Sequence, residues 1–244
     1  MKKIAWVIGS TKPLGSALVN YLVASNFQVT GFSRTPPVSK IDHYQHRIID
    51  LQAIDEFEKL CKHELENGAP NVIIFCQRYR AGQSEGAAAI EKGFRVEVLA
   101  PYFLYKLLKT IGSEVKTNFI FFTSGASKDI HLDIDFPYHL YKSSALMLSK
   151  YIAVKGVVSG IRSNSVVLGE FLKYPLESYG DHEVDKYRKL STYATNQSIC
   201  SIQDIENVVG FLIADSSGYI NGQEIFLDGG FSSISVESLI RNSN

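Results

Sequence analysis

A tyrosine and a lysine four residues apart, Tyr138 and Lys142, lie in a stretch whose apolar residues have helical spacing. Residues four apart project from the same face of a helix, so the ammonium can lie beside the phenol. A nearby positive charge stabilises the phenolate and makes tyrosine usable as a general acid or base. The pair therefore indicates proton transfer, although aromatic residues at helical spacing also pack in cores. We interpret Tyr141, which has a different spacing to the lysine, as a packing residue.

The stretch VIGSTKPLG, residues 7–15, follows a short apolar run and precedes a helical one. Gly9 closes the expected strand and Gly15 lies at the start of the helix, where a missing side chain allows close approach. Backbone N–H groups at such a helix start face a pyrophosphate. Pro13 removes one donor, although proline is favoured in a first helical turn. We interpret the stretch as an altered phosphate-binding loop; the alternative is an ordinary tight turn.

The second expected strand ends in Ser33 and Arg34, where a dinucleotide-binding sheet meets the adenosine ribose. An acidic residue there would accept a hydrogen bond from the ribose 2′-hydroxyl, whereas an arginine can pair with a 2′-phosphate. Lys12 can add a second positive charge from the neighbouring loop. The sequence therefore favours NADP(H) over NAD(H), and the alternative is a pair of solvated surface cations.

Short apolar runs alternate with stretches of helical spacing along the whole chain. The expected strands are residues 4–8, 28–33, 46–50, 71–75, 118–123, 162–168 and 223–228. The expected helices include residues 14–24, 53–65, 98–111 and 138–154. This alternation predicts an α/β fold with one Rossmann-type, doubly wound parallel sheet of about seven strands and helices on both faces.

One domain over residues 1–244 is expected, because the chain shows no repeat or linker that would divide it. The longest region without clear periodicity runs from Gly169 to Ile199 and contains four tyrosines among several lysines and arginines. Long irregular segments of this kind are often lids over a binding site. We predict a substrate lid at about residues 169–199; a polar surface excursion is the alternative.

Composition and charge exclude several classes of protein. The formal net charge is zero and the basic residues are spread along the chain, which argues against nucleic acid as a partner. The three cysteines are far apart and no histidine cluster accompanies them, so no metal site is expected. The apolar run at the start is too short for a signal peptide, and no run approaches the length of a membrane span. These features predict a cytoplasmic protein without a membrane partner.

Three blocks of sequence resemble the short-chain dehydrogenase/reductase family. The segment FPYHLYKSSALMLSKYIAVKGVVSGIRSNSVVLG contains the family's Y-x-x-x-K motif as Tyr138 and Lys142, followed by a strand similar to GIRVNAVAPG. The segment SIQDIENVVGFLIADSSGYINGQEIFLDGG is similar to the closing helix, loop and strand that end in D-G-G. With the glycine loop, the resemblance runs from Met1 to about Phe231.

The resemblance implies a site. Ser124, at the end of the fifth expected strand, would hold the substrate oxygen, Tyr138 would transfer the proton, and Lys142 would support Tyr138. Asp50 and Leu51 look like the family's adenine-binding pair, although Asp50 can equally cap the helix that begins near Ile54. The residues expected to bind the cofactor are Gly9, Thr11, Lys12, Leu14, Gly15, Ser33, Arg34, Asp50, Leu51, Cys76, Tyr138 and Lys142. Ser201 and Asp204 are interpreted as a capping box.

Four departures from the family pattern bear on function: Pro13, the segment 75–78, Glu97 and the pair Leu168–Gly169. Large residues, Phe-Cys-Gln-Arg, stand at 75–78 where the family has N-N-A-G. Glu97 stands where the family has an asparagine that supports a proton relay. Its carboxylate can hold relay water, or it can pair directly with Lys142 and weaken the effect of the ammonium on Tyr138. Arg78 adds a positive charge near the nucleotide or plays only a surface role.

The expected function is that of an NADP(H)-dependent oxidoreductase that acts on a small polar carbonyl or alcohol, with Ser124, Tyr138, Lys142 and Glu97 in the catalytic site. One alternative is a catalytically impaired relative that works as a binding or scaffold protein. Another is a non-redox reaction, such as epimerisation, with a tightly held cofactor. The family resemblance also implies a homodimer or homotetramer, for which the apolar helical stretches would supply the interface.

Overall fold

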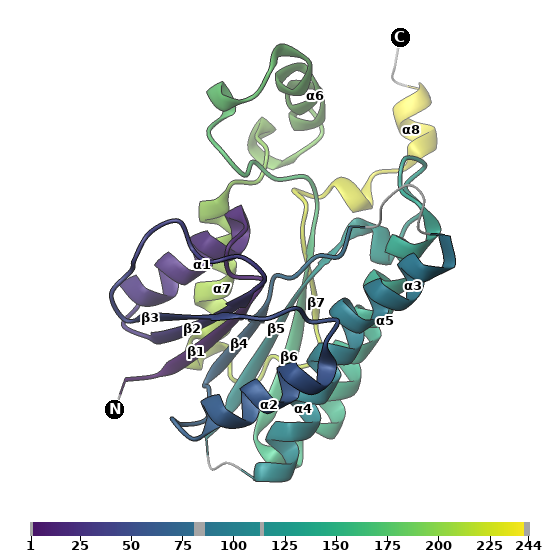
Figure 1. The fold of residues 1–244 in the computed structure, drawn as a ribbon. Helices are drawn as coiled ribbons and strands as arrows, with labels where there is room; N and C mark the ends of the chain where they lie inside the picture. Colours follow the sequence, from purple (N-terminus) through teal and green to yellow (C-terminus); the bar gives the residue numbers. More distant parts are fainter. Residues whose placement is uncertain (1, 81–85, 113–114, 242–244) are drawn as a thin grey trace.

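The computed structural model describes residues 2–80, 86–112 and 115–241, and its centre is one parallel sheet of seven strands. The strand order is β3-β2-β1-β4-β5-β6-β7, and every neighbouring pair is parallel (Figure 1). The strands are β1 (Ile4–Ile8), β2 (Gln28–Ser33), β3 (Tyr44–Ile48), β4 (Val72–Phe75), β5 (Thr117–Ser124), β6 (Ile161–Leu168) and β7 (Glu224–Leu227). The order reverses between β1 and β4, which is the point where ligands of such sheets bind. The predicted doubly wound parallel sheet is confirmed.

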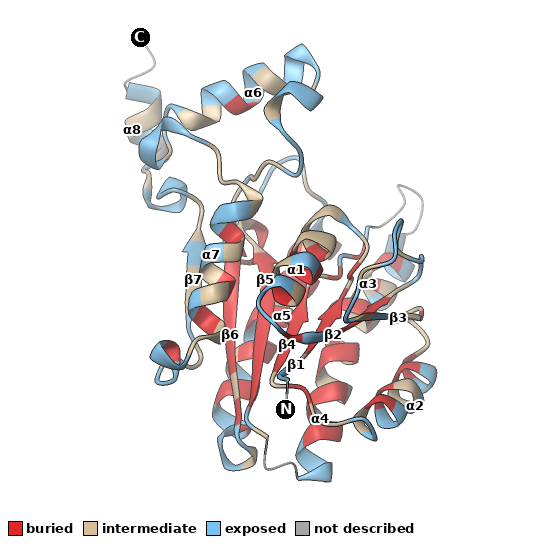
Figure 2. Cartoon of the chain, turned by 90° about the vertical axis from the view of Figure 1, so that its left-hand side faces the viewer, coloured by how far each residue is buried: buried red, intermediate tan, exposed pale blue. Residues whose placement is uncertain are grey.

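Helices cover both faces of the sheet (Figures 1 and 2). One face is covered by α1 (Pro13–Ala24) and α7 (Ile202–Ile213), whose apolar residues share a core cluster with β1, β2 and β6. The other face is covered by α2 (Ile54–Leu65), α4 (Ala100–Ile111) and α5 (Phe136–Lys155). Figure 2 shows the central strands buried and the helices exposed on their outer sides. The near-continuous apolar strands are explained by this double coverage.

A helical run longer than expected precedes β5. It consists of α3 (Gly86–Phe94), a π turn (Arg95–Leu99) and α4. The sequence predicted only a helix over 98–111, because the extra residue of the π turn breaks the α-helical spacing of apolar residues. The π turn buries Val96, Glu97 and Val98, so it brings a carboxylate into the interior.

The remaining expected elements are present with small shifts. All seven expected strands are found; β3 begins at Tyr44, two residues before the expected start, where Tyr44 pairs with Val29 of β2. The capping box at the start of α7 is confirmed, because the Ser201 N–H donates to Asp204 Oδ2 at 2.8 Å and the Asp204 N–H donates to Ser201 Oγ at 3.2 Å.

The segment 169–199 is more ordered than its lack of apolar periodicity suggests. It contains α6 (Asp181–Ser191), which stands away from the body of the molecule beyond the end of β6 (Figure 1). The sequence missed this helix because it buries only Tyr187 and therefore has no apolar stripe. Acidic residues in its first turn and basic residues in its last turn complement the helix dipole.

The helix α8 (Val236–Arg241) follows β7 near the end of the chain. Within the described residues, no helix has the length and apolarity needed to cross a bilayer.

Candidate active site

The glycine loop lies at the reversal point between β1 and β4. Gly9 has φ +87°, a left-handed conformation that favours glycine, and a Cβ added to it would lie 2.6 Å from Gln77 N. A Cβ added to Gly15 would collide with the carbonyl oxygen of Gly9. Both positions therefore need glycine, because a side chain at either one would collide with neighbouring backbone.

The start of α1 has donors to offer an anion. Pro13 occupies the first turn, and Ser16 N donates to Lys12 O at 2.8 Å within the helix. The N–H groups of Leu14 and Gly15 belong to the first turn, and N–H groups in a first turn have no intrahelical partners. No side chain caps this end in the described chain, and its first turn holds no acidic residue. Pro13 thus begins the helix, and the N–H groups that follow it in the first turn can still bind an anion.

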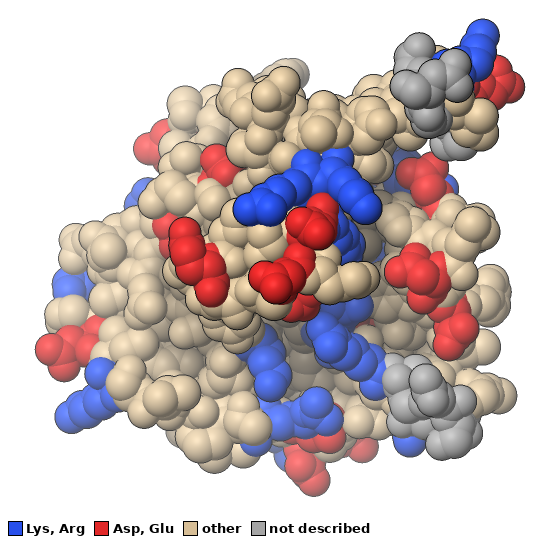
Figure 3. All heavy atoms as spheres, turned by 90° about the horizontal axis from the view of Figure 1, so that it is seen from above, with Lys and Arg blue, Asp and Glu red and all other residues tan. Residues whose placement is uncertain are grey.

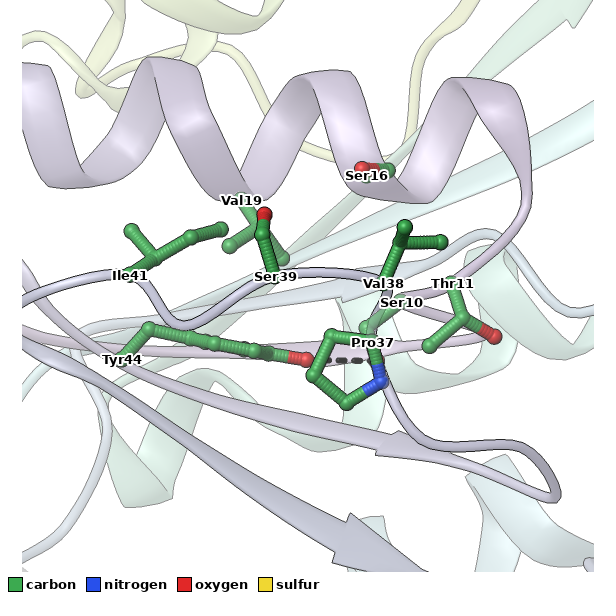
Figure 4. Close-up of a pocket in the computed structure, with 9 residues that line it drawn as sticks. All are labelled: Ser10, Thr11, Ser16, Val19, Pro37, Val38, Ser39, Ile41 and Tyr44. Atoms are coloured by element: carbon green, nitrogen blue, oxygen red, sulfur yellow. Dashed lines mark hydrogen bonds between the residues drawn. The ribbon is translucent and has the colours of Figure 1, made fainter.

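Hydroxyl groups connect the glycine loop to the end of β2. Thr11 Oγ1 lies 2.9 Å from Ser33 Oγ and 3.0 Å from Thr35 Oγ1. Beside them is a hollow of about 60 Å³, and Tyr44 Oη donates to Ser10 Oγ at 3.1 Å in its wall (Figure 4). Its lining residues are Ser10, Thr11, Ser16, Val19, Pro37, Val38, Ser39, Ile41 and Tyr44.

The two cations predicted for this edge, Lys12 and Arg34, are both exposed. Figure 3 looks down on this side of the molecule and shows Lys and Arg side chains gathered near the middle of the face, with Asp and Glu among them. The segments after β1 and β2 thus combine hydroxyl groups with two exposed cations, Lys12 and Arg34.

Asp50 and Leu51 follow β3, and Cys76 follows β4. The alternative that Asp50 caps α2 is wrong, because the N-cap residue is Ala53 and no side chain caps that end. Asp50 Oδ1 instead accepts from Gln52 N at 3.0 Å. Leu51 is buried, and Cys76 N donates to Ile8 O at 2.8 Å, which holds the end of β4 beside β1.

Tyr138 and Lys142 lie on α5, as predicted, and Ser124 ends β5. Lys142 Nζ lies 5.8 Å from the centroid of the Tyr138 ring. Ser124 Oγ accepts from Ala126 N at 3.3 Å, so its hydroxyl proton remains available to another acceptor. Tyr138 itself is half-buried.

Glu97 pairs directly with Lys142. Glu97 Oε2 accepts from Lys142 Nζ at 2.9 Å, and the two side chains are only 3% and 5% exposed. Glu97 Oε1 accepts from Tyr79 N at 2.8 Å, so both carboxylate oxygens have partners. Of the two arrangements considered for Glu97, the direct ion pair is therefore the one present.

This pairing decides the charge state of Lys142. Burial by itself lowers the pKa of Lys142, but attraction by Glu97 and by Tyr138 outweighs burial and raises the pKa above its ordinary 10.5. The Lys142 ammonium therefore stays protonated throughout the neutral range.

Two further side chains surround Tyr138. The Cζ atom of Arg78 lies over the Tyr138 ring, 4.9 Å from its centroid. The ring of Tyr141 meets it edge to face at 5.6 Å, and Tyr141 Oη donates to Tyr79 O at 3.3 Å in the core. Tyr141 is thus the packing residue that its spacing indicated. The contact of Arg78 was missed because it joins a loop to a distant helix, and no local pattern encodes such a contact.

The sequence of this chain is similar to a family model and to several known proteins. A family model described as "Enoyl-(Acyl carrier protein) reductase" matches residues 83–232. The enoyl-[acyl-carrier-protein] reductase [NADH] FabI of Buchnera aphidicola is 28% identical over 86 residues, which is 34% of this chain and 31% of that protein. Senescence-associated protein 13 of Arabidopsis thaliana is 24% identical over 249 residues, covering 93% of this chain and 88% of that protein. The chain thus spans about a third of the first relative and most of the second.

Solved structures share the fold. A short chain dehydrogenase family protein from Francisella tularensis superposes with a TM-score of 0.80 at 20% identity, and 4-hydroxyisoleucine dehydrogenase complexed with NADH superposes with 0.81 at 20%. ElxO with NADP bound superposes with 0.79 at 17% identity. Each match covers 96% of this chain and 100% of the other. Among these neighbours, one binds NADH and another binds NADP.

Proposed function

Because the chain belongs to the short-chain dehydrogenase/reductase family, we propose that it is an NADP(H)-dependent oxidoreductase that transfers hydride between the nicotinamide and a small polar carbonyl or alcohol. The observation that carries this proposal is the meeting of Tyr138 and Lys142 on α5, beside the strand that ends in Ser124. A phenol with an adjacent ammonium, near a free hydroxyl, can deliver a proton to a bound carbonyl oxygen.

The glycine loop fits a dinucleotide. Gly9 and Gly15 allow the loop to pack closely against the segment after β4 and against the start of α1. The first-turn N–H groups of α1 suit a pyrophosphate. Gly9, Thr11, Lys12, Leu14 and Gly15 would hold the phosphates in this proposal. Ser33 and Arg34 would contact the adenosine ribose with its 2′-phosphate, and Asp50, Leu51 and Cys76 would line the adenine side. When bound, the nicotinamide supplies or accepts the hydride.

The side chains divide the proton chemistry. Ser124 Oγ holds the substrate oxygen by a hydrogen bond, and Tyr138 Oη gives that oxygen its proton in reduction or removes the proton in oxidation. Lys142 lies behind Tyr138, and Glu97 fixes its ammonium through the 2.9 Å ion pair. Glu97 is therefore a positioning residue, because it acts through Lys142.

The segment 169–199 is proposed as the substrate side of the site. It places Tyr174, Tyr179 and Tyr187 beside one another, and Lys186 pairs with Glu170 at 3.0 Å. Tyrosine hydroxyls and basic side chains suit polar or anionic substrates better than purely apolar ones. Activity restricted to apolar ketones would contradict this substrate class.

Transfer of deuterium tests the proposed reaction. NADPH carrying deuterium at the reactive carbon of the nicotinamide is incubated with a panel of small polar aldehydes and ketones, and the products are analysed by mass spectrometry. Net transfer of one deuterium to an alcohol product, lost in Tyr138→Phe, is the expected result. Exchange or epimerisation of a substrate without net transfer would favour a non-redox reaction.

Replacement of Arg34 tests the cofactor preference. Arg34→Ala is expected to weaken NADPH binding by about 10- to 100-fold, because a charge-assisted hydrogen bond to the 2′-phosphate is lost. NADH lacks that phosphate, so its affinity should change little. Calorimetric titration of both cofactors measures the difference, and Lys40→Ala removes an exposed cation downstream of Arg34 as a control. Equal losses for NADPH and NADH would remove the assignment of Arg34 to the phosphate.

A second candidate function is a binding or scaffold role without catalysis. It is favoured by the large side chains at 75–78 and by the direct compensation of Lys142 by Glu97. Failure of deuterium transfer together with retained cofactor affinity would support it.

We also propose that the protein forms a homodimer or homotetramer. The outer face of α5 exposes Met147, Tyr151 and Val154, which lie one or two turns apart. An apolar helix face of this kind is suited to pack against a second copy. Sedimentation of the purified chain at the mass of one protomer would contradict this assembly.

A further inference from the structure

The positive charge of Lys142 is compensated by the carboxylate of Glu97, close to the Tyr138 ring that Lys142 is expected to support. Its Nζ lies 2.9 Å from Glu97 Oε2, and both side chains are almost fully buried. At the distance of the Tyr138 ring, two opposite unit charges so close together act largely as a dipole, whose field falls off faster than that of a lone cation. The hydrogen bond from Tyr79 N to Glu97 Oε1 keeps the carboxylate in this position. Because it is paired with Glu97, Lys142 stabilises a negative charge on Tyr138 less than an unpaired lysine would.

A second cation lies nearer to the ring. Arg78 Cζ is 4.9 Å from the centroid of Tyr138, whereas Lys142 Nζ is 5.8 Å away. An arginine guanidinium is a permanent cation. Among the residues that the structure describes, no carboxylate forms an ion pair with this charge.

The field of Arg78 also reaches the other titratable groups of this cluster. Burial raises the pKa of Tyr141, Glu97 and Tyr138 add to the rise, and Arg78 opposes it. Arg78 likewise opposes the attraction that raises the pKa of Lys142. Its side chain is exposed, so part of this influence is screened by water.

We propose that Arg78 supplies the uncompensated positive charge that stabilises the phenolate of Tyr138 during proton transfer, while the Glu97–Lys142 pair mainly holds the geometry. This inference rests on the proposed function, because it assigns Tyr138 as the proton donor. Arg78 acts through Tyr138 and is a positioning residue. It stands in the segment after β4, where the resembled family has small residues.

Among residues 2–80, 86–112 and 115–241, the charged and titratable groups around the Tyr138 ring come from three places. Arg78 comes from the segment after β4, Lys142 and Tyr141 come from α5, and Glu97 comes from the π turn behind Lys142. Arg78 is the exposed member, so replacing it should leave the fold intact, whereas replacing Glu97 or Lys142 disturbs a buried pair.

Titration of Tyr138 in the cofactor-free protein tests the inference without any turnover. The chain is labelled with ¹³C at tyrosine Cζ, and the Tyr138 signal is assigned by its loss in Tyr138→Phe. We expect Arg78→Met to move the titration midpoint of Tyr138 upward by about one pH unit, at the low end for a neighbouring charge because Arg78 is exposed. Arg78→Lys keeps the charge and should stay much closer to the unsubstituted protein.

Arg80→Met is the matched control, since it removes the same charge from an exposed position two residues away. The inference is overturned if Arg78→Met leaves the Tyr138 midpoint unchanged, or if Arg80→Met moves it equally. Where turnover is found, the pH profile of kcat/KM should reflect ionisation of Tyr138, and in Arg78→Met this profile should shift to higher pH by the same amount. A shifted midpoint without deuterium transfer to any carbonyl would instead refute the proposed function and leave the charge arrangement standing.

Discussion

Replacing Tyr138 with phenylalanine is expected to lower turnover by about 10³-fold or more while cofactor affinity changes little. The phenyl ring keeps the edge-to-face contact with Tyr141 and the cation contact with Arg78, so the fold of this region should persist. Only the transferable proton is lost. Steady-state rates with the carbonyl that accepts deuterium, together with NADPH titration, measure both quantities.

Tyr141→Phe provides a matched control on the same helix. It also removes one phenolic hydroxyl, but that group donates to Tyr79 O in the core and faces no reactant in the proposed mechanism. Turnover within about 10-fold of the unsubstituted protein is expected, with a modest loss of stability from the missing hydrogen bond. If Tyr138→Phe retained turnover while Tyr141→Phe lost it, Tyr141 would be the proton donor.

Replacing Glu97 with alanine is expected to destabilise the protein by about 3–5 kcal/mol, because the charge of Lys142 would remain buried without its partner. In a chain of 244 residues this corresponds to a fall in the melting temperature of roughly 10 °C. Chemical and thermal unfolding followed by circular dichroism measure the loss. A loss below about 1 kcal/mol would mean that water readily reaches Lys142.

The double variant Glu97→Leu with Lys142→Met separates the ion pair from simple loss of packing. Replacing both buried charges by apolar side chains of similar size is often neutral or stabilising. The double variant should therefore recover much of the stability that Glu97→Ala loses, while it remains inactive. A double variant as unstable as the single one would mean that the hydrogen bond from Tyr79 N, rather than the charge pair, carries the effect.

The same pair predicts the pH dependence of stability. The pKa of Lys142 is raised in the folded protein, so its protonation stabilises the fold fully below its ordinary pKa of 10.5. That contribution is lost as the pH rises through the folded value. The stability difference between the unsubstituted protein and Glu97→Ala should be constant near neutral pH and shrink above about pH 10.5.

The sequence predicts the sheet well because its strands are buried on both faces. Near-continuous apolar runs such as IAWVI and NVIIF are typical of strands buried on both faces, and their alternation with helices predicts a parallel sheet. The sequence did not predict helix α6, because its mostly exposed residues show no apolar period of 3.6, although its ends carry the acidic and basic residues typical of a helix. The π turn was not predicted either, because its added residue shifts the buried face of the helix and interrupts the spacing of apolar residues.

The residues of the candidate site also fall into a group that the sequence could locate and a group that it could not. The positions of Tyr138, Lys142 and Ser124 were predictable, because the family resemblance points to them and one helical spacing and one strand end locate them. The sequence left the arrangement of Glu97 open, because the choice between relay water and a direct pair depends on how far the π turn carries its carboxylate toward α5. The position of Arg78 over the Tyr138 ring depends on the tertiary packing of a loop, which spacing along the chain does not encode.

Calorimetric titration of the cofactor-free protein with NADPH and with NADH tests the central claim most directly. The claim is that the loop with Pro13 still binds a dinucleotide and that the edge with Lys12 and Arg34 favours the 2′-phosphate. The protein is first checked by absorbance for cofactor retained from expression. Micromolar binding of NADPH with much weaker binding of NADH is the predicted result. Absence of binding to either cofactor, in folded protein, would contradict the account and point to the scaffold role.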